Sequence, residues 1–161
     1  MGPDGLASML LIETQELITY PLYLLFKKSL KDTVIPDDWK QAIVTLIFKK
    51  GNRNKADNYR PVSLTSIIGK TFEAIIRDVL VRYLEDNHLI TDSQHGFRKG
   101  RSCFTNLLEF YKVTGCIDRP IGENIDIVFL DFAKAFDKVS HKRLIMKMRS
   151  HGIRGKILDW I

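Results

Sequence analysis

Asp131 is the residue of this 161-residue sequence whose surroundings best suit metal chemistry. It follows the apolar run Ile127-Val128-Phe129-Leu130, which is typical of a strand, and Phe136 comes five residues later. A carboxylate at the end of a strand can bind a divalent cation, and two such cations can clamp the oxygens of a phosphoryl transfer. Taken alone, such an aspartate more often caps a turn or a helix.

Further motifs precede Asp131 along the chain. In order, they are Gly2-Pro3-Asp4-Gly5, Val34-Ile35-Pro36-Asp37-Asp38-Trp39-Lys40, Phe48-Lys49-Lys50-Gly51, Asn58-Tyr59-Arg60-Pro61-Val62-Ser63-Leu64 and Gln94-His95-Gly96-Phe97-Arg98-Lys99-Gly100-Arg101-Ser102. Together with the run from Leu130 to His141, this set resembles the reverse transcriptases of non-LTR (LINE-type) retrotransposons over nearly the whole chain. The resemblance implies an α+β fold: the fingers and partial palm of a right-hand polymerase. Fingers with palm-entry elements would span about residues 1–120, and the start of the palm about 121–161.

Two later motifs of that family are not found in this sequence: a Gly-Val-Pro-Gln-Gly-like loop and an aromatic-x-Asp-Asp turn. The pair Asp37-Asp38 lies too early to replace the second. We therefore expect a fragment of an RNA-directed DNA polymerase, truncated before its catalytic Asp-Asp motif and inactive as an isolated chain. The intact relative would perform magnesium-dependent nucleotidyl transfer. The alternative is a catalytically inactive, nucleic-acid-binding remnant of that domain.

The resemblance also implies roles for residues near the reacting phosphate. Asp131 would be the first catalytic aspartate and would hold Mg²⁺, with the backbone carbonyl of Phe132 as a further ligand, in keeping with the preference of Mg²⁺ for oxygen. Phe136 would lie under the sugar of the incoming nucleotide. Its ring would collide there with a 2′-hydroxyl, the group that separates ribonucleotides from deoxyribonucleotides.

Five cations are the candidates for binding phosphate. In relatives the arginine that corresponds to Arg60 grips the triphosphate, a task that suits its planar, permanently charged guanidinium. Either Lys49 or Lys50 would supply a second charge, and the sequence leaves that choice open. Arg98 and Arg101, in a glycine-rich basic segment, are the candidates for contact with the template.

The net charge of +6 is unevenly distributed. Between Lys27 and Lys70 there are ten Lys and Arg against four Asp and Glu, whereas the remainder balances at fifteen against fifteen. A basic surface attracts polyanions in a salt-dependent way, although it can also serve only for solubility. With the resemblance, it predicts an RNA template, a DNA primer and deoxynucleoside triphosphates as partners.

Composition argues against several other classes of protein. No apolar run approaches the length of a membrane span, and no basic region precedes an apolar stretch as in a signal peptide. Cys103 and Cys116 lack a metal-binding spacing and the four histidines are scattered, so we expect no zinc site. We expect reduced thiols and an intracellular location, in the cytoplasm, the nucleus or both.

The elements that must position these residues follow from local patterns. We predict helices over 9–18 and 20–31, the second with Pro21 in its first turn, a strand over 42–48, a polar loop over 49–58 and an extended start at Arg60-Pro61. Ser66 should cap a helix whose apolar stripe packs into the core: Ile68, Phe72, Ile75, Ile76, Val79, Leu80, Tyr83 and Leu84. Beyond it we predict a helix capped by Ser102, a buried strand over 125–131, and helices over 140–150 and 156–161, all in one domain.

Overall fold

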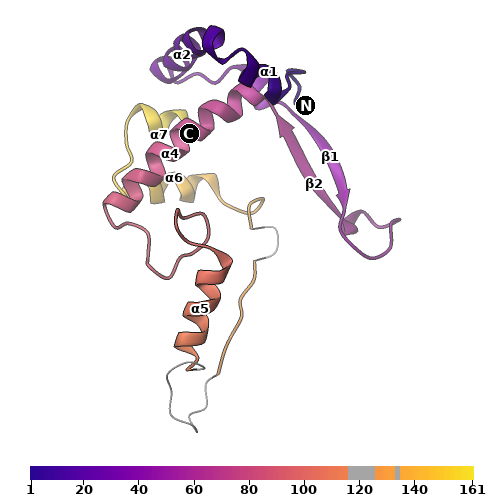
Figure 1. Ribbon diagram of the computed structural model, residues 1–161, viewed down its shortest axis with the longest axis vertical. Coiled ribbons are helices and arrows are strands. Elements are labelled where there is room, and N and C mark those ends of the chain that lie inside the picture. The colour runs from indigo at the N-terminus through magenta and orange to yellow at the C-terminus, as the bar shows by residue number, and fades with distance from the viewer. Residues whose placement is uncertain (116–125, 133–134) are drawn as a thin grey trace. The chain divides into compact units, whose positions relative to one another are not determined.

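The structure is a computed structural model that describes residues 1–115, 126–132 and 135–161. Its contacts divide the chain into two compact units (Figure 1). The first unit comprises Met1–Val79 and Met148–Ile161, and the second comprises Leu80–Lys147. The described residues form helices and one two-stranded sheet, which confirms the α+β class.

The elements follow one another with short connections. The bounds in the first unit are α1 (Ser8–Glu13), α2 (Gln15–Asp32), α3 (Asp37–Lys40), β1 (Ala42–Phe48), the 3₁₀ turn η1 (Ala56–Asn58), β2 (Tyr59–Thr65), the first part of α4 (Ile67–Asp86), and α7 (Lys156–Trp160). The second unit contains the end of α4, α5 (Cys103–Val113) and most of α6 (His141–Ser150). Within the described part of the chain, no helix is both long and apolar enough to cross a membrane.

Strands β1 and β2 form an antiparallel hairpin, as the β-branched run over 42–48 and the extended start at Arg60-Pro61 predict. Ala42 lies opposite Thr65 at one end of the hairpin, and Phe48 lies opposite Tyr59 at the other. The polar connection between the strands corresponds to the predicted loop. Figure 1 shows β2 leading directly into α4, so this junction joins the hairpin to the helices of the first unit.

The N-terminus of α4 is capped by two side chains. Ser66, almost fully buried, accepts a hydrogen bond at Oγ from the backbone N–H of Gly69 at 3.2 Å, which confirms its predicted role. Asp4, far away in the sequence, accepts another at Oδ2 from the N–H of Ile67 at 2.8 Å and a local one at Oδ1 from Leu6 at 3.2 Å. Two of the N–H groups that the first turn of a helix leaves unpaired are thereby satisfied.

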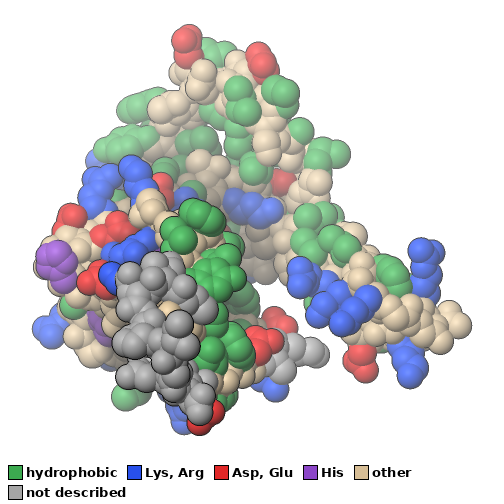
Figure 2. Space-filling model, turned by 60° about the horizontal axis from the view of Figure 1, so that its bottom comes forward, with side chains coloured by type: hydrophobic (Ala, Val, Ile, Leu, Met, Phe, Trp, Pro, Cys, Tyr) green, Lys and Arg blue, Asp and Glu red, His purple; other side chains and the backbone are tan. Residues whose placement is uncertain are grey.

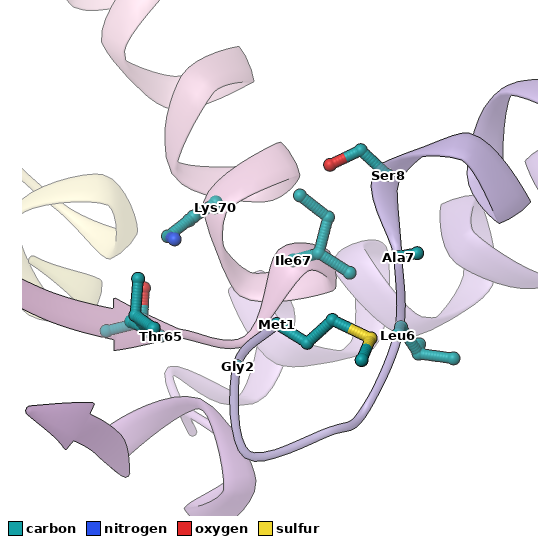
Figure 3. A pocket seen from close by; sticks show the side chains of 9 residues that line it. Met1, Gly2, Leu6, Ala7, Ser8, Thr65, Ile67 and Lys70 are labelled. Carbon is teal, nitrogen blue, oxygen red and sulfur yellow. The ribbon is translucent and has the colours of Figure 1, made fainter. Parts of the chain in front are cut away.

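The motif Gly2-Pro3-Asp4-Gly5 delivers Asp4 to this position. A Cβ atom on Gly2 would lie 2.3 Å from the backbone oxygen of Thr65, so only glycine allows this approach to the end of β2. Gly5, at a φ of 63°, closes a turn by donating its N–H to the oxygen of Gly2 at 3.1 Å. Figure 3 shows the segment passing Thr65 and the first turn of α4, beside a pocket of about 260 Å³. We refer to residues 2–5 as the N-terminal clip.

Aromatic rings form the core of the first unit. Phe72 of α4 stacks on Phe26 of α2 with ring centroids 4.5 Å apart, and the edges of Trp160 and Trp39 approach it at 4.9 and 6.0 Å. The Nε1–H of Trp160 donates to Ser29 Oγ at 2.9 Å, which satisfies the polar atom of this buried indole. Phe72 therefore joins three separate segments of the chain.

The predicted core stripe along α4 is only partly buried. Phe72 and Ile76 are buried, whereas Ile75, Val79 and Tyr83 are 50%, 53% and 38% exposed. Ile68, Leu80 and Leu84 are half-buried, so only part of the stripe packs into the core of the described structure. Helical periodicity identifies an apolar face but does not supply the element that must cover it.

The predicted boundary between the first two helices is wrong. The break occurs at Thr14, whose N–H and hydroxyl both bond to the carbonyl of Leu10, and Pro21 lies inside α2. A proline in a helix interior removes one backbone hydrogen bond. The packing of Phe26 and Ser29 later in the same helix holds α2 together despite that loss.

In the second unit, the predicted helices are present and the predicted strand is not. Helix α5 begins with a capping box in which Ser102 and Thr105 bond reciprocally, and α6 matches the helix predicted over 140–150. In the first unit, α7 likewise matches the helix predicted over 156–161. Residues 126–132 carry no strand, and Ile125 lies outside the described residues. Cys103 is an exposed free thiol, and Cys116 also lies outside the described residues.

The missing strand leaves an apolar segment in solvent. Val128, Phe129 and Leu130 are 78%, 80% and 84% exposed. A strand exists only where a neighbour accepts and donates its backbone hydrogen bonds, and the described residues offer this segment no such neighbour. Its apolar composition is typical of a segment that other residues cover, and the described residues do not cover it.

Replacing Asp4 by Asn is expected to destabilise the first unit by about 1 kcal/mol at neutral pH, because the amide keeps one acceptor oxygen and loses one of the two backbone hydrogen bonds that the carboxylate accepts. Burial opposes ionisation of Asp4, but hydrogen bonds from Ser66, Leu6 and Ile67 outweigh it and lower the pKa of its carboxyl below 3.8. A lowered pKa contributes stability above pH 3.8 that is lost as the pH falls below it. Urea unfolding between pH 3 and 7 should show that decline in the wild type and less of it in Asp4→Asn. An equal effect of Glu73→Gln, an exposed acid in mid-α4, would contradict the capping role.

Phe72→Ala and Leu130→Ala form a matched test of where the core lies. The first removes a ring that is 5% exposed and should cost about 3–5 kcal/mol. The second removes a side chain that is 84% exposed and should change the stability by less than about 0.5 kcal/mol, while reducing aggregation. Thermal unfolding and light scattering measure both. A large loss of stability in Leu130→Ala would show that residues 126–132 are packed in solution.

Candidate nucleotide and nucleic-acid site

The tip of the β1–β2 hairpin is strongly basic. Between residues 49 and 60 a single acid, Asp57, accompanies five exposed cations: Lys49, Lys50, Arg53, Lys55 and Arg60. Figure 2 shows Lys and Arg side chains gathered toward the end of this hairpin. Within the part of the chain that is described, none of the five forms an ion pair, and the guanidinium of Arg53 lies 5.2 Å from the ring centre of Phe48. We refer to residues 49–60 as the hairpin tip.

The strand register distinguishes Lys49 from Lys50, a choice that the sequence alone left open. Arg60 lies opposite Ile47, and the N–H of Lys49 donates to the carbonyl of Asn58 at 2.8 Å, which extends the ladder by one residue. Side chains alternate between faces along a strand, so Lys49 shares the face of Ile47 and Arg60. The chain bends at Lys50, away from that ladder. Lys49 is therefore the lysine placed beside Arg60.

In the second unit, the basic segment before α5 is anchored by a histidine. His95 is 6% exposed, with its Nδ1 2.9 Å from Thr105 Oγ1 and its Nε2 2.5 Å from Glu109 Oε2. Sequence reasoning missed this group, because it treated the histidines as scattered. The available signal was the spacing of Thr105 and Glu109, which places both on one face of α5.

The two predicted template contacts differ in their surroundings. The side chain of Arg98 is only 16% exposed, and its guanidinium donates to the carbonyl of Thr91 at 3.0 Å. It also lies 3.7 Å from a carboxylate oxygen of Glu85 and 3.8 Å from one of Asp92. Arg101 is 32% exposed, with Asp92 at 4.0 Å. Arg98 is thus engaged within its own unit, and Arg101 is the more available of the two.

The predicted metal ligand lies in the exposed segment. Asp131 and Phe132 are exposed, and Phe136 is 83% exposed with its ring edge-on to Phe97 at 6.4 Å. Phe97 adopts a left-handed backbone conformation, with φ at 60°. Among the described residues, no group of three or more His, Cys, Asp or Glu side chains could hold a metal ion. The donors that two Mg²⁺ ions require are not assembled around Asp131 in these residues.

Comparison with known proteins supplies the family. The sequence profile described as reverse transcriptase (RNA-dependent DNA polymerase) matches residues 47–161, which include the hairpin tip, the His95 segment and Asp131. The chain belongs to the reverse transcriptase family. This confirms the family that the ordered motifs predicted.

The relatives come from mobile elements of the non-LTR (LINE) type. The chain is 32% identical over 130 residues to a probable RNA-directed DNA polymerase from transposon BS and 30% identical over 130 residues to that of the mobile element jockey, both of Drosophila melanogaster. It is 27% identical over 151 residues to a Pol polyprotein of the retrotransposable element R1 of Bradysia coprophila. These matches cover 80%, 80% and 91% of this reverse transcriptase chain but 14% of each relative. The chain thus corresponds to one segment of a LINE-type RNA-directed DNA polymerase.

Proposed function

We propose that this chain supplies the fingers and the opening of the palm of an RNA-directed DNA polymerase, and that its hairpin tip binds the phosphates of nucleic acid and of the incoming deoxynucleotide. The observation that carries the proposal is the set of exposed cations at the tip, which have no carboxylate partners among the described residues. Cations left without intramolecular partners remain able to exchange counterions for phosphates. An intracellular location, in the cytoplasm, the nucleus or both, belongs to the same proposal.

Lys49 and Arg60 are the proposed triphosphate ligands. They share one face of the hairpin, and Arg60 precedes Pro61 in an extended strand that fixes its backbone. A guanidinium can bind two phosphate oxygens at once, and an ammonium adds a point charge beside it. Together they would neutralise part of a triphosphate and hold it against one side of the hairpin.

Asp131, Phe132 and Phe136 are proposed to act on the nucleotide by virtue of the family resemblance. Asp131 would contribute a carboxylate and Phe132 a carbonyl oxygen to Mg²⁺, whose chemistry when bound is to stabilise charge on phosphoryl oxygens. Phe136 would exclude a 2′-hydroxyl by its bulk and by offering it no hydrogen bond. Their exposure in the structure leaves all three accessible to a ligand.

The template contact is proposed for Arg101, with Arg98 in a supporting role. Arg98 donates to the carbonyl of Thr91 and lies near the carboxylates of Glu85 and Asp92 within its own unit, so its removal would disturb the segment that carries Arg101. Arg101 keeps a larger exposed fraction and a single distant carboxylate, Asp92. Phosphate contacts of this kind fix the position of a nucleic acid without reading its sequence.

RNA binding with steep salt dependence is expected of the 161-residue protein. Replacing Lys49 and Arg60 by Ala should reduce the slope of log affinity against log salt by about two, because two phosphate contacts are lost. The matched control replaces Lys28 and Lys31 of α2 by Ala, which removes the same charge from exposed positions. Fluorescence anisotropy with a labelled RNA–DNA hybrid measures both variants.

Two results of that titration would contradict the proposal. Binding that does not respond to salt would exclude phosphate contacts as its source. An equal loss in the hairpin variant and in the α2 control would show that diffuse positive charge, rather than the hairpin tip, attracts the nucleic acid.

The 161-residue polypeptide by itself is expected not to extend a DNA primer on an RNA template with Mg²⁺. One carboxylate, Asp131, leaves Mg²⁺ with most of its waters and weakly bound. Primer extension measures this, with Asp131→Ala as the control. Extension that disappears in Asp131→Ala would contradict the expectation, and it would also exclude the alternative of a purely nucleic-acid-binding remnant.

A further inference from the structure

The segment between His95 and Ser102 is closed into a loop by one hydroxyl group. Thr105 Oγ1 lies 2.9 Å from His95 Nδ1 and accepts a hydrogen bond from the N–H of Ser102 at 2.9 Å. The two ends of the segment therefore meet at a single side chain of α5. Residues 96–101 lie between these ends in the sequence and contain the cations Arg98, Lys99 and Arg101. We call residues 96–101 the basic loop.

The hydrogen-bond partners of His95 indicate which of its ring nitrogens carries a proton. The carboxylate of Glu109 can only accept, so the Nε2 of His95 carries the proton that is directed at it. The hydroxyl group of Thr105 is the hydrogen-bond partner of Nδ1. Its oxygen can accept a hydrogen bond, and its single proton can be donated either to Nδ1 or to the carbonyl of Ser102, which is 2.9 Å away. Both ring nitrogens of a side chain that is 6% exposed are thus satisfied.

Arg98 contacts Thr91, Glu85 and Asp92 from the middle of the basic loop, but only the Thr105 hydroxyl joins the two ends of the loop among the described residues. The loop contains Gly96 and Gly100, and Phe97 is held in a left-handed conformation that costs a non-glycine residue free energy. Such a conformation persists only where its surroundings fix it. Joining the ends of a loop removes conformations that the free chain would otherwise sample.

We propose that His95 is a positioning residue that, through Thr105 and Glu109, closes the basic loop onto α5 and thereby holds Lys99 and Arg101 ready to bind nucleic-acid phosphate. The ligand in this proposal rests on the proposed function, whereas closure of the loop can be measured without any ligand. Lys99 is exposed and Arg101 is partly exposed, so both can reach a phosphate from a closed loop.

The decisive variants change Glu109, because electrostatics alone predicts the opposite result. Glu109→Ala and the control Glu73→Ala each remove one negative charge, so each should strengthen RNA binding if only net charge matters. Loss of the attachment should instead weaken binding of a single-stranded RNA on the order of tenfold in Glu109→Ala, as for one charge-assisted hydrogen bond. Glu109→Gln, whose amide oxygen still accepts from Nε2, should restore part of that affinity.

Limited trypsin digestion of the full 161-residue protein tests closure separately from binding. Cleavage after Lys99 and Arg101 should accelerate on the order of tenfold in Glu109→Ala and in His95→Ala, but not in Glu73→Ala. The reason is that a loop enters the active site of a protease only after it has detached from its contacts. Circular dichroism establishes that each variant retains its helices. If His95→Ala fails to fold, the Glu109 variants carry the test.

The outcomes separate this proposal from the proposed function. Cleavage that is unchanged in Glu109→Ala would overturn the closure, and faster cleavage with unchanged RNA affinity would overturn the positioning role. A wild-type protein that does not bind RNA would overturn the proposed function and the positioning role with it, while the digestion would still decide whether His95 closes the loop. Faster cleavage with weaker binding, partly restored by Glu109→Gln, is the expected result.

Discussion

The capped N-terminus of α4 is the constraint on which the arrangement of the first unit depends. A helix that begins inside a protein must find acceptors for its first N–H groups, and here Ser66 and Asp4 provide them. Ser66 directly follows β2, so the same turn that starts the helix also sets where the hairpin joins the helices of the unit. Phe72, in the second turn of this helix, then gathers α2 and α7 around it. One junction thus connects the aromatic core with the strand that carries Arg60.

The features that could be predicted from the sequence are those with local causes. The hairpin strands follow from β-branched residues and from Pro61, and the starts of α4 and α5 follow from serine caps, because each signal and its effect lie within a few residues. The family could be predicted as well, because six ordered motifs are a specific pattern. Counting charge located the basic excess only to the stretch between Lys27 and Lys70, and the structure then showed five of its cations at the hairpin tip.

The features that could not be predicted depend on residues far apart or on missing neighbours. Nothing local shows that Asp4 would cap a helix that starts at Ile67, or that His95 would bond to Glu109. The prediction of a strand before Asp131 was wrong because a strand needs a neighbour. The local composition is that of a buried strand, but the described residues provide no strand for it to pair with. The choice between the two lysines needed the strand register, which composition does not encode.

Mapping the bound surface residue by residue would test the central claim most directly. Backbone amide shifts of the ¹⁵N-labelled protein, followed while an RNA–DNA hybrid is added at low and at physiological salt, report which segments contact phosphate. The account predicts the largest changes between Phe48 and Arg60, fading as salt is raised. Changes that spare the hairpin tip and concentrate on α2 or α6, or that persist unchanged at high salt, would contradict it.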